Sequence, residues 1–179
     1  MSDTDILREL FSSRVVVRIV GSKVTLEEPA QPESRVTINN VPEDAVCVKA
    51  DGIDMRQLFG DTDRGECKRA DYLLFSESKK CVLVIELKSK KDAWPKICQQ
   101  LHGASCLARY CGEVGKTFWR ARDFLQGYRH CFVSISHTVI KKASQDDKVE
   151  SSRLDPLVKI KRISHPHHLQ FSKLIAESK

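Results

Sequence analysis

Three features of the sequence predict a single mixed α/β domain over residues 1–179, with a central β-sheet flanked by helices. A chain of 179 residues fits one domain with a substantial core. Strand-like runs rich in β-branched residues come first, then two helical patterns, then two more strand-like runs, and this order favours a mixed domain. The run at residues 82–85 is apolar on both faces, which is typical of a central strand covered on both sides.

The first part of the chain is predicted to be mostly strand. Residues 2–11 form a short capped helix with apolar residues at helical spacing, and residues 14–28 form a hairpin around a glycine–serine turn. The runs at residues 35–41 and 45–50 are expected to extend the sheet of this hairpin. Residues 51–66 are polar and punctuated by glycine, so we expect a loop with one short helical turn.

Two strands joined by a short turn form the centre of the predicted sheet. Residues 69–75 and 81–88 are the strands, and the polar segment 76–80 suits a hairpin loop. A period of two places four residues on one face of the second strand: Val82, Val84, Glu86 and Lys88. The other face consists of Leu83, Ile85 and Leu87. A carboxylate and an ammonium group therefore end the most hydrophobic strand of the chain.

A helix is predicted directly after this strand, over residues 91–111. Asp92 is expected to cap it, and Pro95 lies in its first turn, where the missing N–H does no harm. The buried stripe of this helix consists of Ile97, Leu101, Ala104 and Ala108. Gln99 then falls on the far side. Gln100 lies at the flank of the stripe, near enough to the sheet to point along its edge.

The rest of the chain is predicted to alternate between helix and strand. A second helix covers residues 116–128. Strands at residues 130–140 and 156–164 follow, separated by the polar segment 141–155, which we expect to be a mobile surface loop. Residues 169–178 form a short amphipathic tail.

Composition and charge indicate which partners and which compartment to expect for the protein. The chain carries 30 Lys and Arg against 24 Asp and Glu, a net charge of +6 that leans toward a polyanionic partner. No apolar run approaches the roughly 20 residues that a membrane helix needs, so no membrane partner is expected. The N-terminus lacks the basic start and apolar block of a secretory signal. Seven cysteines without a CxxC pair are interpreted as reduced thiols, which predicts a cytoplasmic protein.

Asp71, Glu86 and Lys88 form the constellation that carries chemistry. In a hairpin the beginning of one strand lies beside the end of the other, so Asp71 can approach Glu86 with only about 5 Å between the strands. Two carboxylates this close repel each other unless a cation lies between them, and Mg²⁺ or Mn²⁺ suits an oxygen site. Lys88 could then orient or deprotonate a metal-bound water, or stabilise charge on a phosphate. The alternative is a surface Glu–Lys pair at a strand end.

This pattern resembles the motif of the PD-(D/E)XK nuclease superfamily over roughly residues 69–101. The elements are Asp71, then Glu86-Leu87-Lys88 after an apolar strand, then a helix that carries Gln100. Ala70 stands where the family name implies proline. The resemblance implies a restriction-endonuclease-like core and a Mg²⁺-dependent nuclease.

The resemblance also implies roles for individual residues. Asp71 and Glu86 would hold the metal, with the backbone carbonyl of Leu87 as a further ligand. Lys88 would position the attacking water, and Gln100 would support the site or touch the nucleic acid backbone. Members often add an acidic residue from the first helix, for which Glu9 is the candidate.

The leading prediction is therefore a metal-dependent nuclease that hydrolyses phosphodiester bonds, with DNA favoured over RNA. Lys90, Lys91 and Lys96 would flank the site and meet phosphates, unless they are a solvated face. A chain of this size would act as a homodimer or beside a partner that supplies target recognition. The alternative is a catalytically silent nucleic-acid-binding or protein-interaction module with the same fold. Strandedness, sequence specificity, pathway and the role of the histidines at 165–168 stay open.

Overall fold

The computed structural model of the chain describes residues 1–28, 31–52, 55–60, 62–90, 92–140 and 142–177. Within these residues a large sheet has seven strands: β1 (Val16–Val17), β5 (Val46–Lys49), β6 (Tyr72–Ser76), β7 (Cys81–Lys88), β8 (Arg129–Ser136), β9 (Asp146–Ser151) and β10 (Lys159–Ser164). A small sheet has four: β2 (Ile19–Val20), β3 (Lys23–Glu28), β4 (Gln31–Asn39) and β11 (Leu169–Gln170). The helices are α1 (Asp3–Leu10), the short 3-10 helix η1 (Met55–Gln57), α2 (Trp94–Phe118) and α3 (Phe171–Ile175).

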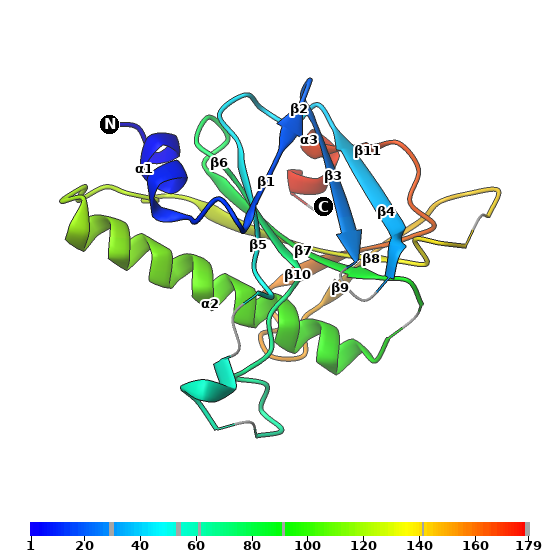
Figure 1. Cartoon of the computed structure of the whole chain (residues 1–179). Coiled ribbons are helices and arrows are strands. Elements are labelled where there is room, and N and C mark those ends of the chain that lie inside the picture. Colours follow the sequence, from blue (N-terminus) through cyan, green and yellow to red (C-terminus); the bar gives the residue numbers. More distant parts are fainter. Residues whose placement is uncertain (29–30, 53–54, 61, 91, 141, 178–179) are drawn as a thin grey trace.

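The predicted mixed α/β class with a central sheet is confirmed. The large sheet has the order β1-β5-β6-β7-β8-β10-β9, in which β7 is antiparallel to β6 and parallel to β8. The long helix α2 lies along one face of this sheet, and the small sheet and α3 lie on the other (Figure 1). The central position of β7 follows from its sequence, because its apolar residues fill both faces.

Two hydrophobic cores hold these three layers together. Between the large sheet and α2, the core includes Leu73, Phe75, Val82, Val84, Ile97 and Leu101. Between the large sheet and the small sheet, it includes Leu26, Ile38, Leu74, Leu83, Ile85 and Phe171. Alternation along β7 therefore sends its side chains to opposite cores, as the period of two predicts. The predicted buried stripe of the helix is also confirmed, since all four of its residues are buried.

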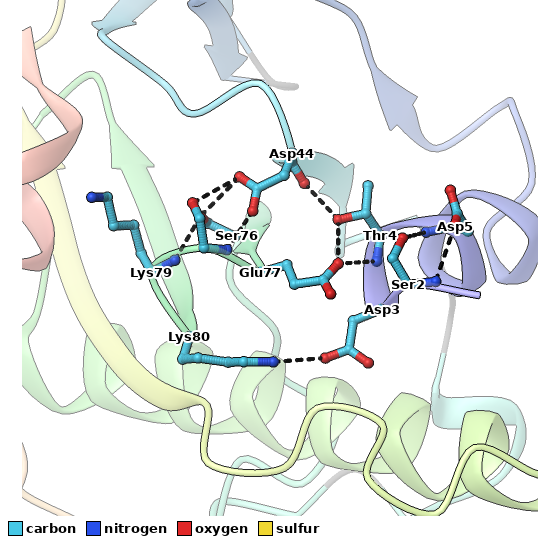
Figure 2. Close-up of polar contacts among 10 residues, drawn as sticks. Ser2, Asp3, Thr4, Asp5, Asp44, Ser76, Glu77, Lys79 and Lys80 are labelled. Carbon is cyan, nitrogen blue, oxygen red and sulfur yellow. Dashed lines mark hydrogen bonds and ion pairs between the residues drawn. The ribbon is translucent and has the colours of Figure 1, made fainter.

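The predicted N-terminal helix is confirmed, and it closes one end of the β6–β7 hairpin. Ser2 and Asp5 form a capping box at the start of α1. The backbone N–H of Thr4 donates to Glu77 Oε2 at 2.9 Å, and Ser76 Oγ donates to Asp44 Oδ1 at 3.2 Å (Figure 2). These contacts surround the hairpin turn. At the other end of the hairpin β6 begins and β7 ends, and this end carries Asp71, Glu86 and Lys88.

The strands before residue 51 divide between the two sheets, which corrects one expectation. β2 and β3 form the predicted hairpin and β4 extends it, but β1 pairs with β5 in the large sheet. β5 therefore does not extend the hairpin sheet as predicted. The reason is burial on both sides: Val46 and Val48 enter the core beneath α2, whereas Cys47 enters the other core.

The second helix predicted at residues 116–128 is wrong. α2 continues from Trp94 to Phe118, and the chain then turns. Arg120 and Leu125 both adopt a φ of 55°, a left-handed conformation that a helix does not allow. Phe124 folds back onto α2 so closely that a Cβ at Gly115 would lie 2.1 Å from its ring. The apolar residues of this segment pack as a turn against α2.

Two further expectations are corrected. Asp92 is not the N-cap of α2, because Ala93 occupies that position without a side-chain hydrogen bond, although Pro95 does lie in the first turn as predicted. The expected loop at 141–155 contains β9, which pairs antiparallel with β10 along the edge of the large sheet. β9 is mostly exposed and polar, so backbone pairing rather than burial makes it a strand, and hydropathy gives no sign of it.

The other elements agree with expectation. The segment after residue 51 is irregular with η1 as its short helical turn, and the tail forms β11 and α3. None of the helices in the described ranges has an apolar stretch long enough to cross a membrane.

Candidate active site at the end of the central hairpin

Asp71 directly precedes β6, and its side chain adds one hydrogen bond to the ladder between β6 and β7. At this end of the hairpin the final backbone pair is Tyr72 with Ile85, so Asp71 lies beside the end of β7. The backbone N–H of Leu87 donates to Asp71 Oδ2 at 2.6 Å, where a backbone carbonyl would otherwise accept. On the other side, Ala50 N donates to the carbonyl oxygen of Asp71 at 2.8 Å. Asp71 is thus fixed at the predicted position and is 8% exposed.

Glu86 is fully buried, and its main partner comes from the same strand. Neither carboxylate oxygen of Glu86 receives a hydrogen bond of normal geometry, and the ammonium Nζ of Lys88 lies 2.5 Å from Oε1. Lys88 Nζ also lies 3.6 Å from Asp92 Oδ2, which Lys96 Nζ contacts at 3.0 Å. Lys88 therefore sits between a buried carboxylate and a half-buried one, in a short chain of ion pairs.

Burial dominates the electrostatics of the two acidic residues. It raises the pKa of Asp71, and the charges of Asp51 and Glu28 add to this effect, although the hydrogen bond from Leu87 opposes it. Burial also raises the pKa of Glu86, and the charge of Asp71 raises it further against the opposing charge of Lys88. Both carboxyl groups therefore keep their protons to a higher pH than ordinary carboxyl groups do.

At Lys88 the neighbouring charges, rather than burial, decide the direction of the pKa shift. Burial acts to lower the pKa of Lys88, but the charges of Glu86, Asp71 and Asp92 outweigh it, and the pKa is raised. A raised pKa keeps Lys88 in its ammonium form, which has no free electron pair to accept a proton. Of the two roles considered for Lys88 toward a metal-bound water, orienting the water fits this environment and deprotonating it does not.

The carbonyl of Leu87 faces the same side as Asp71. In a β-strand the N–H and the C=O of one residue point to the same side of the strand. Because Leu87 N–H donates to Asp71, the oxygen of Leu87 is directed toward the end of β6 as well. Two carboxylates, of Asp71 and Glu86, and the backbone carbonyl of Leu87 thus lie at one end of the hairpin.

Gln100 lies on α2, the helix that packs over β7, and its amide oxygen Oε1 is buried without a hydrogen-bond partner. Within the described part of the chain, no hydrogen bond links Gln100 to Asp71, Glu86 or Lys88. Gln99 instead donates from Nε2 to the carbonyl oxygen of Asp63 at 2.8 Å, which holds the preceding loop against the helix. Gln99 therefore contacts the loop before β6, and the orientation of Gln100 along the edge of the sheet stays a prediction.

The lysines predicted to meet phosphates flank this strand end. Lys90 is exposed just beyond β7, and Lys96 is exposed on the first turn of α2, where it pairs with Asp92. Lys91 lies outside the described residues.

Glu9 is not brought to the site. It is exposed on α1, and its Oε2 accepts a hydrogen bond of 2.8 Å from Trp119 Nε1 at the end of α2. The site lies at the opposite end of α2, and a helix of 25 residues is about 37 Å long. Figure 1 shows α1 beside the C-terminal end of α2. Glu9 therefore takes no part in the metal site proposed below.

Sequence reasoning missed Glu28, at the end of β3 in the small sheet. Its Oε2 is buried and receives no hydrogen bond, and its charge raises the pKa of Asp71. The signal available in the sequence was the pair of glutamates that ends an alternating strand, Glu27 and Glu28. Nothing in the sequence separates these two neighbours.

Two histidines of the 165–168 segment, whose role the sequence left open, have contacts in the structure. The ring of His165 stacks on that of His137, with centroids 4.8 Å apart, and its Nδ1 lies 3.1 Å from the carbonyl oxygen of Ile140. His167 Nε2 lies 3.2 Å from the carbonyl oxygen of Lys142. These contacts hold two surface segments together.

Comparison with models of protein families, with curated proteins and with solved structures finds no match to this chain. The chemistry of the site is therefore judged from its own residues. No three Asp, Glu, His or Cys side chains in the described ranges are gathered closely enough to hold a metal ion together. Mg²⁺ does not require such a group, because it keeps several waters and binds through one or two carboxylates. Asp71, Glu86 and the carbonyl of Leu87 fit that requirement.

Proposed function

We propose that this protein is a Mg²⁺- or Mn²⁺-dependent nuclease of the PD-(D/E)XK type, with a restriction-endonuclease-like core, which hydrolyses phosphodiester bonds in nucleic acid. One observation carries the proposal. Two buried carboxylates, Asp71 and Glu86, lie at the end of the central hairpin, and Lys88 Nζ lies 2.5 Å from Oε1 of Glu86. Burying two carboxylates costs free energy, which a strand end with a purely structural role would avoid.

Each residue has a role that follows from its position. Asp71, Glu86 and the carbonyl of Leu87 would hold the cation. When bound, the cation stabilises negative charge on the phosphate and lowers the pKa of a bound water. Glu86 would then exchange its contact with Lys88 for the cation. Lys88 would remain protonated beside Asp92, where it orients the attacking water and balances charge on the phosphate.

The surrounding residues would bind the nucleic acid backbone. Lys90 and Lys96 are exposed on either side of the site, and cations in such positions contact phosphates. Gln100 would use its amide to support the site. DNA is favoured over RNA as the substrate, and a cytoplasmic location is part of the proposal. We further propose a homodimer or a partner protein for target recognition, and a monomer that cuts unaided at low concentration would contradict this part.

A second candidate is a catalytically silent nucleic-acid-binding or protein-interaction module with the same fold. The contact between Lys88 and Glu86 favours it, because this ion pair neutralises Glu86 without a metal. The nuclease proposal is preferred because all three charged residues of the motif are present and adjacent.

A cleavage assay separates the two candidates. Purified protein is incubated with plasmid, linear duplex DNA, single-stranded DNA and RNA, each with Mg²⁺, Mn²⁺ or EDTA. Lys88→Ala is compared with Lys116→Ala, because Lys116 pairs with Glu113 on the far part of α2. The nuclease proposal predicts cutting that requires metal, is lost in Lys88→Ala and is kept in Lys116→Ala. Binding without cutting on every substrate supports the silent module.

A further inference from the structure

β7 is the first of three adjacent parallel strands whose carboxyl ends lie at one edge of the large sheet. β8 is parallel to β7, and β10 is parallel to β8. The last residues of these strands, Lys88, Ser136 and Ser164, are direct neighbours in the register, and the two serine hydroxyl oxygens lie 3.0 Å apart. In open α/β sheets, ligands bind outside the carboxyl ends of the strands. A ligand held at Lys88 is therefore expected to continue along this edge toward β10.

One step further in, the same three strands bring a carboxylate and a guanidinium group onto one face of the sheet. Glu86, Ser134 and Arg162 are direct neighbours in the register. Val84 and Ile160, two residues earlier on β7 and β10, enter the core beneath α2. Because side chains alternate along a strand, Glu86 and Arg162 also lie on the α2 side. Two strand spacings separate their backbones by about 10 Å.

The guanidinium group of Arg162 is held in place by two neighbouring elements. Its Cζ lies 4.6 Å from the centre of the Trp94 ring at the start of α2, and its Nη1 donates to Glu150 Oε1 on β9 at 2.7 Å. The side chain of Arg162 is still 25% exposed. A guanidinium group has five N–H donors, and in the described residues only Nη1 has a hydrogen-bond acceptor. The other donors are available for a phosphate, which arginine binds through charge-assisted hydrogen bonds.

We propose that Arg162 binds a backbone phosphate of the nucleic acid near the cleaved bond, with the nucleic acid strand running along the carboxyl ends of β7, β8 and β10. This inference rests on the proposed function and adds the direction in which the substrate lies. The hydroxyl groups of Ser136 and Ser164 lie along this path and are of a kind that donates to phosphate oxygens. Lys148, opposite Arg162 on the edge strand β9, is exposed and continues the positive charge.

The test measures binding of a labelled duplex DNA to the full chain by fluorescence anisotropy over a range of KCl concentrations. Measurements in EDTA, and in Mn²⁺ in the Glu86→Gln background, keep the DNA uncut. Arg162→Gln is compared with Arg8→Gln, which removes the same charge from α1 beside the far end of α2 (Figure 1). Arg162→Gln is expected to weaken binding about tenfold and to reduce the slope of log K against log salt by about 1. Arg8→Gln should resemble wild type.

Glu150→Gln separates phosphate binding from a structural role of the ion pair. This change breaks the same contact but keeps Arg162, so a purely structural role predicts weaker DNA binding in both variants. The proposal predicts tighter DNA binding by Glu150→Gln, because Arg162 loses a competing acceptor. The gain should exceed that of Glu113→Gln, which removes the same charge from the far part of α2. Weaker binding by Glu150→Gln, or a gain no larger than that of Glu113→Gln, would overturn the inference.

The outcomes separate this inference from the proposed function. If wild type binds and cuts DNA and Arg162→Gln binds it equally well, the inference fails and the nuclease proposal stands. If Arg162→Gln loses affinity but wild type cuts no substrate with Mg²⁺ or Mn²⁺, the phosphate contact stands and the catalytic proposal fails. If wild type binds no nucleic acid, both fail.

Discussion

The ammonium group of Lys88 lies 2.5 Å from the buried carboxylate of Glu86, two residues earlier on the same strand. In this arrangement the protein supplies its own cation to a fully buried carboxylate. A second acceptor for Lys88, Asp92, lies 3.6 Å away. We propose that a divalent cation takes the place of Lys88 at Glu86, while the contact with Asp92 keeps Lys88 beside the site.

The metal-free protein should lose stability as the pH rises from the ordinary carboxyl range toward about 7 for Asp71 and about 8 for Glu86, and the loss should level off above these values. The pKa values of Asp71 and Glu86 are raised in the folded state, mainly by burial. Their favourable contribution is therefore complete below the ordinary carboxyl pKa and is lost as the pH rises through the raised values. Urea unfolding from pH 5 to pH 9 measures this, and Glu86→Gln should flatten the profile. Added Mn²⁺ should stabilise wild type most at the alkaline end, and an equal effect at pH 5 would contradict this prediction.

Lys88→Ala should destabilise the metal-free protein by about 3 kcal/mol at pH 8, since removal of one partner leaves a buried charge uncompensated. The loss should be smaller at pH 5, where Glu86 is protonated. Urea denaturation at both pH values gives the comparison. Lys116→Ala is the control, because it breaks an exposed ion pair of a kind that contributes about 0.5 kcal/mol or less. Equal losses for the two variants would show that Glu86 does not depend on Lys88.

Asp92→Asn should change the pH dependence of cleavage rather than abolish it. Asp92 is one of three acidic residues whose charges raise the pKa of Lys88. Its removal should lower the pKa of Lys88, so activity that needs the ammonium form should decline at a lower pH. The pH–rate profile measures this directly. Lys96→Met removes the other partner of Asp92 and should leave the alkaline limb in place; a shift of the same size in both variants would assign the effect to general charge.

Thr4→Val should reduce stability without changing metal affinity. Thr4 is buried, and its hydroxyl lies 2.9 Å from the carbonyl oxygen of Asp44 and 3.0 Å from Glu77 Oε2. Loss of such a hydrogen bond with a buried acceptor costs about 1–3 kcal/mol. The contact lies at the turn end of the β6–β7 hairpin, opposite the site (Figure 2). Chemical unfolding and Mn²⁺ calorimetry together check the prediction, and weaker Mn²⁺ binding would mean that the two ends are linked.

The central hairpin could be predicted because its determinants are local. A two-sided apolar run defines β7, the turn at 76–80 defines its pairing with β6, and this pairing alone brings Asp71 to Glu86. The proposed site could be placed at this strand end for the same reason. Lys90 and Lys96 lie beside the site because they follow β7 closely in the chain.

Glu28 could not be predicted because its position depends on contacts that are distant in sequence. Tyr72 and Glu27 are 45 residues apart, and no sequence periodicity predicts that the Tyr72 hydroxyl group binds the backbone of Glu27. The misplaced helix at 116–128 has a related cause: its apolar residues suit a helix, but Phe124 packs back on Gly115. Hydropathy also missed β9, because backbone pairing at a sheet edge leaves no apolar pattern.

The most direct test of the central claim compares cleavage and binding by wild type and Glu86→Gln on the same labelled duplex DNA, in saturating Mn²⁺. The substitution keeps the shape of the side chain and removes only its charge. The account predicts that Glu86→Gln binds the DNA as wild type does and does not cut it. Cleavage by Glu86→Gln at the rate of wild type would contradict the assignment of the active site.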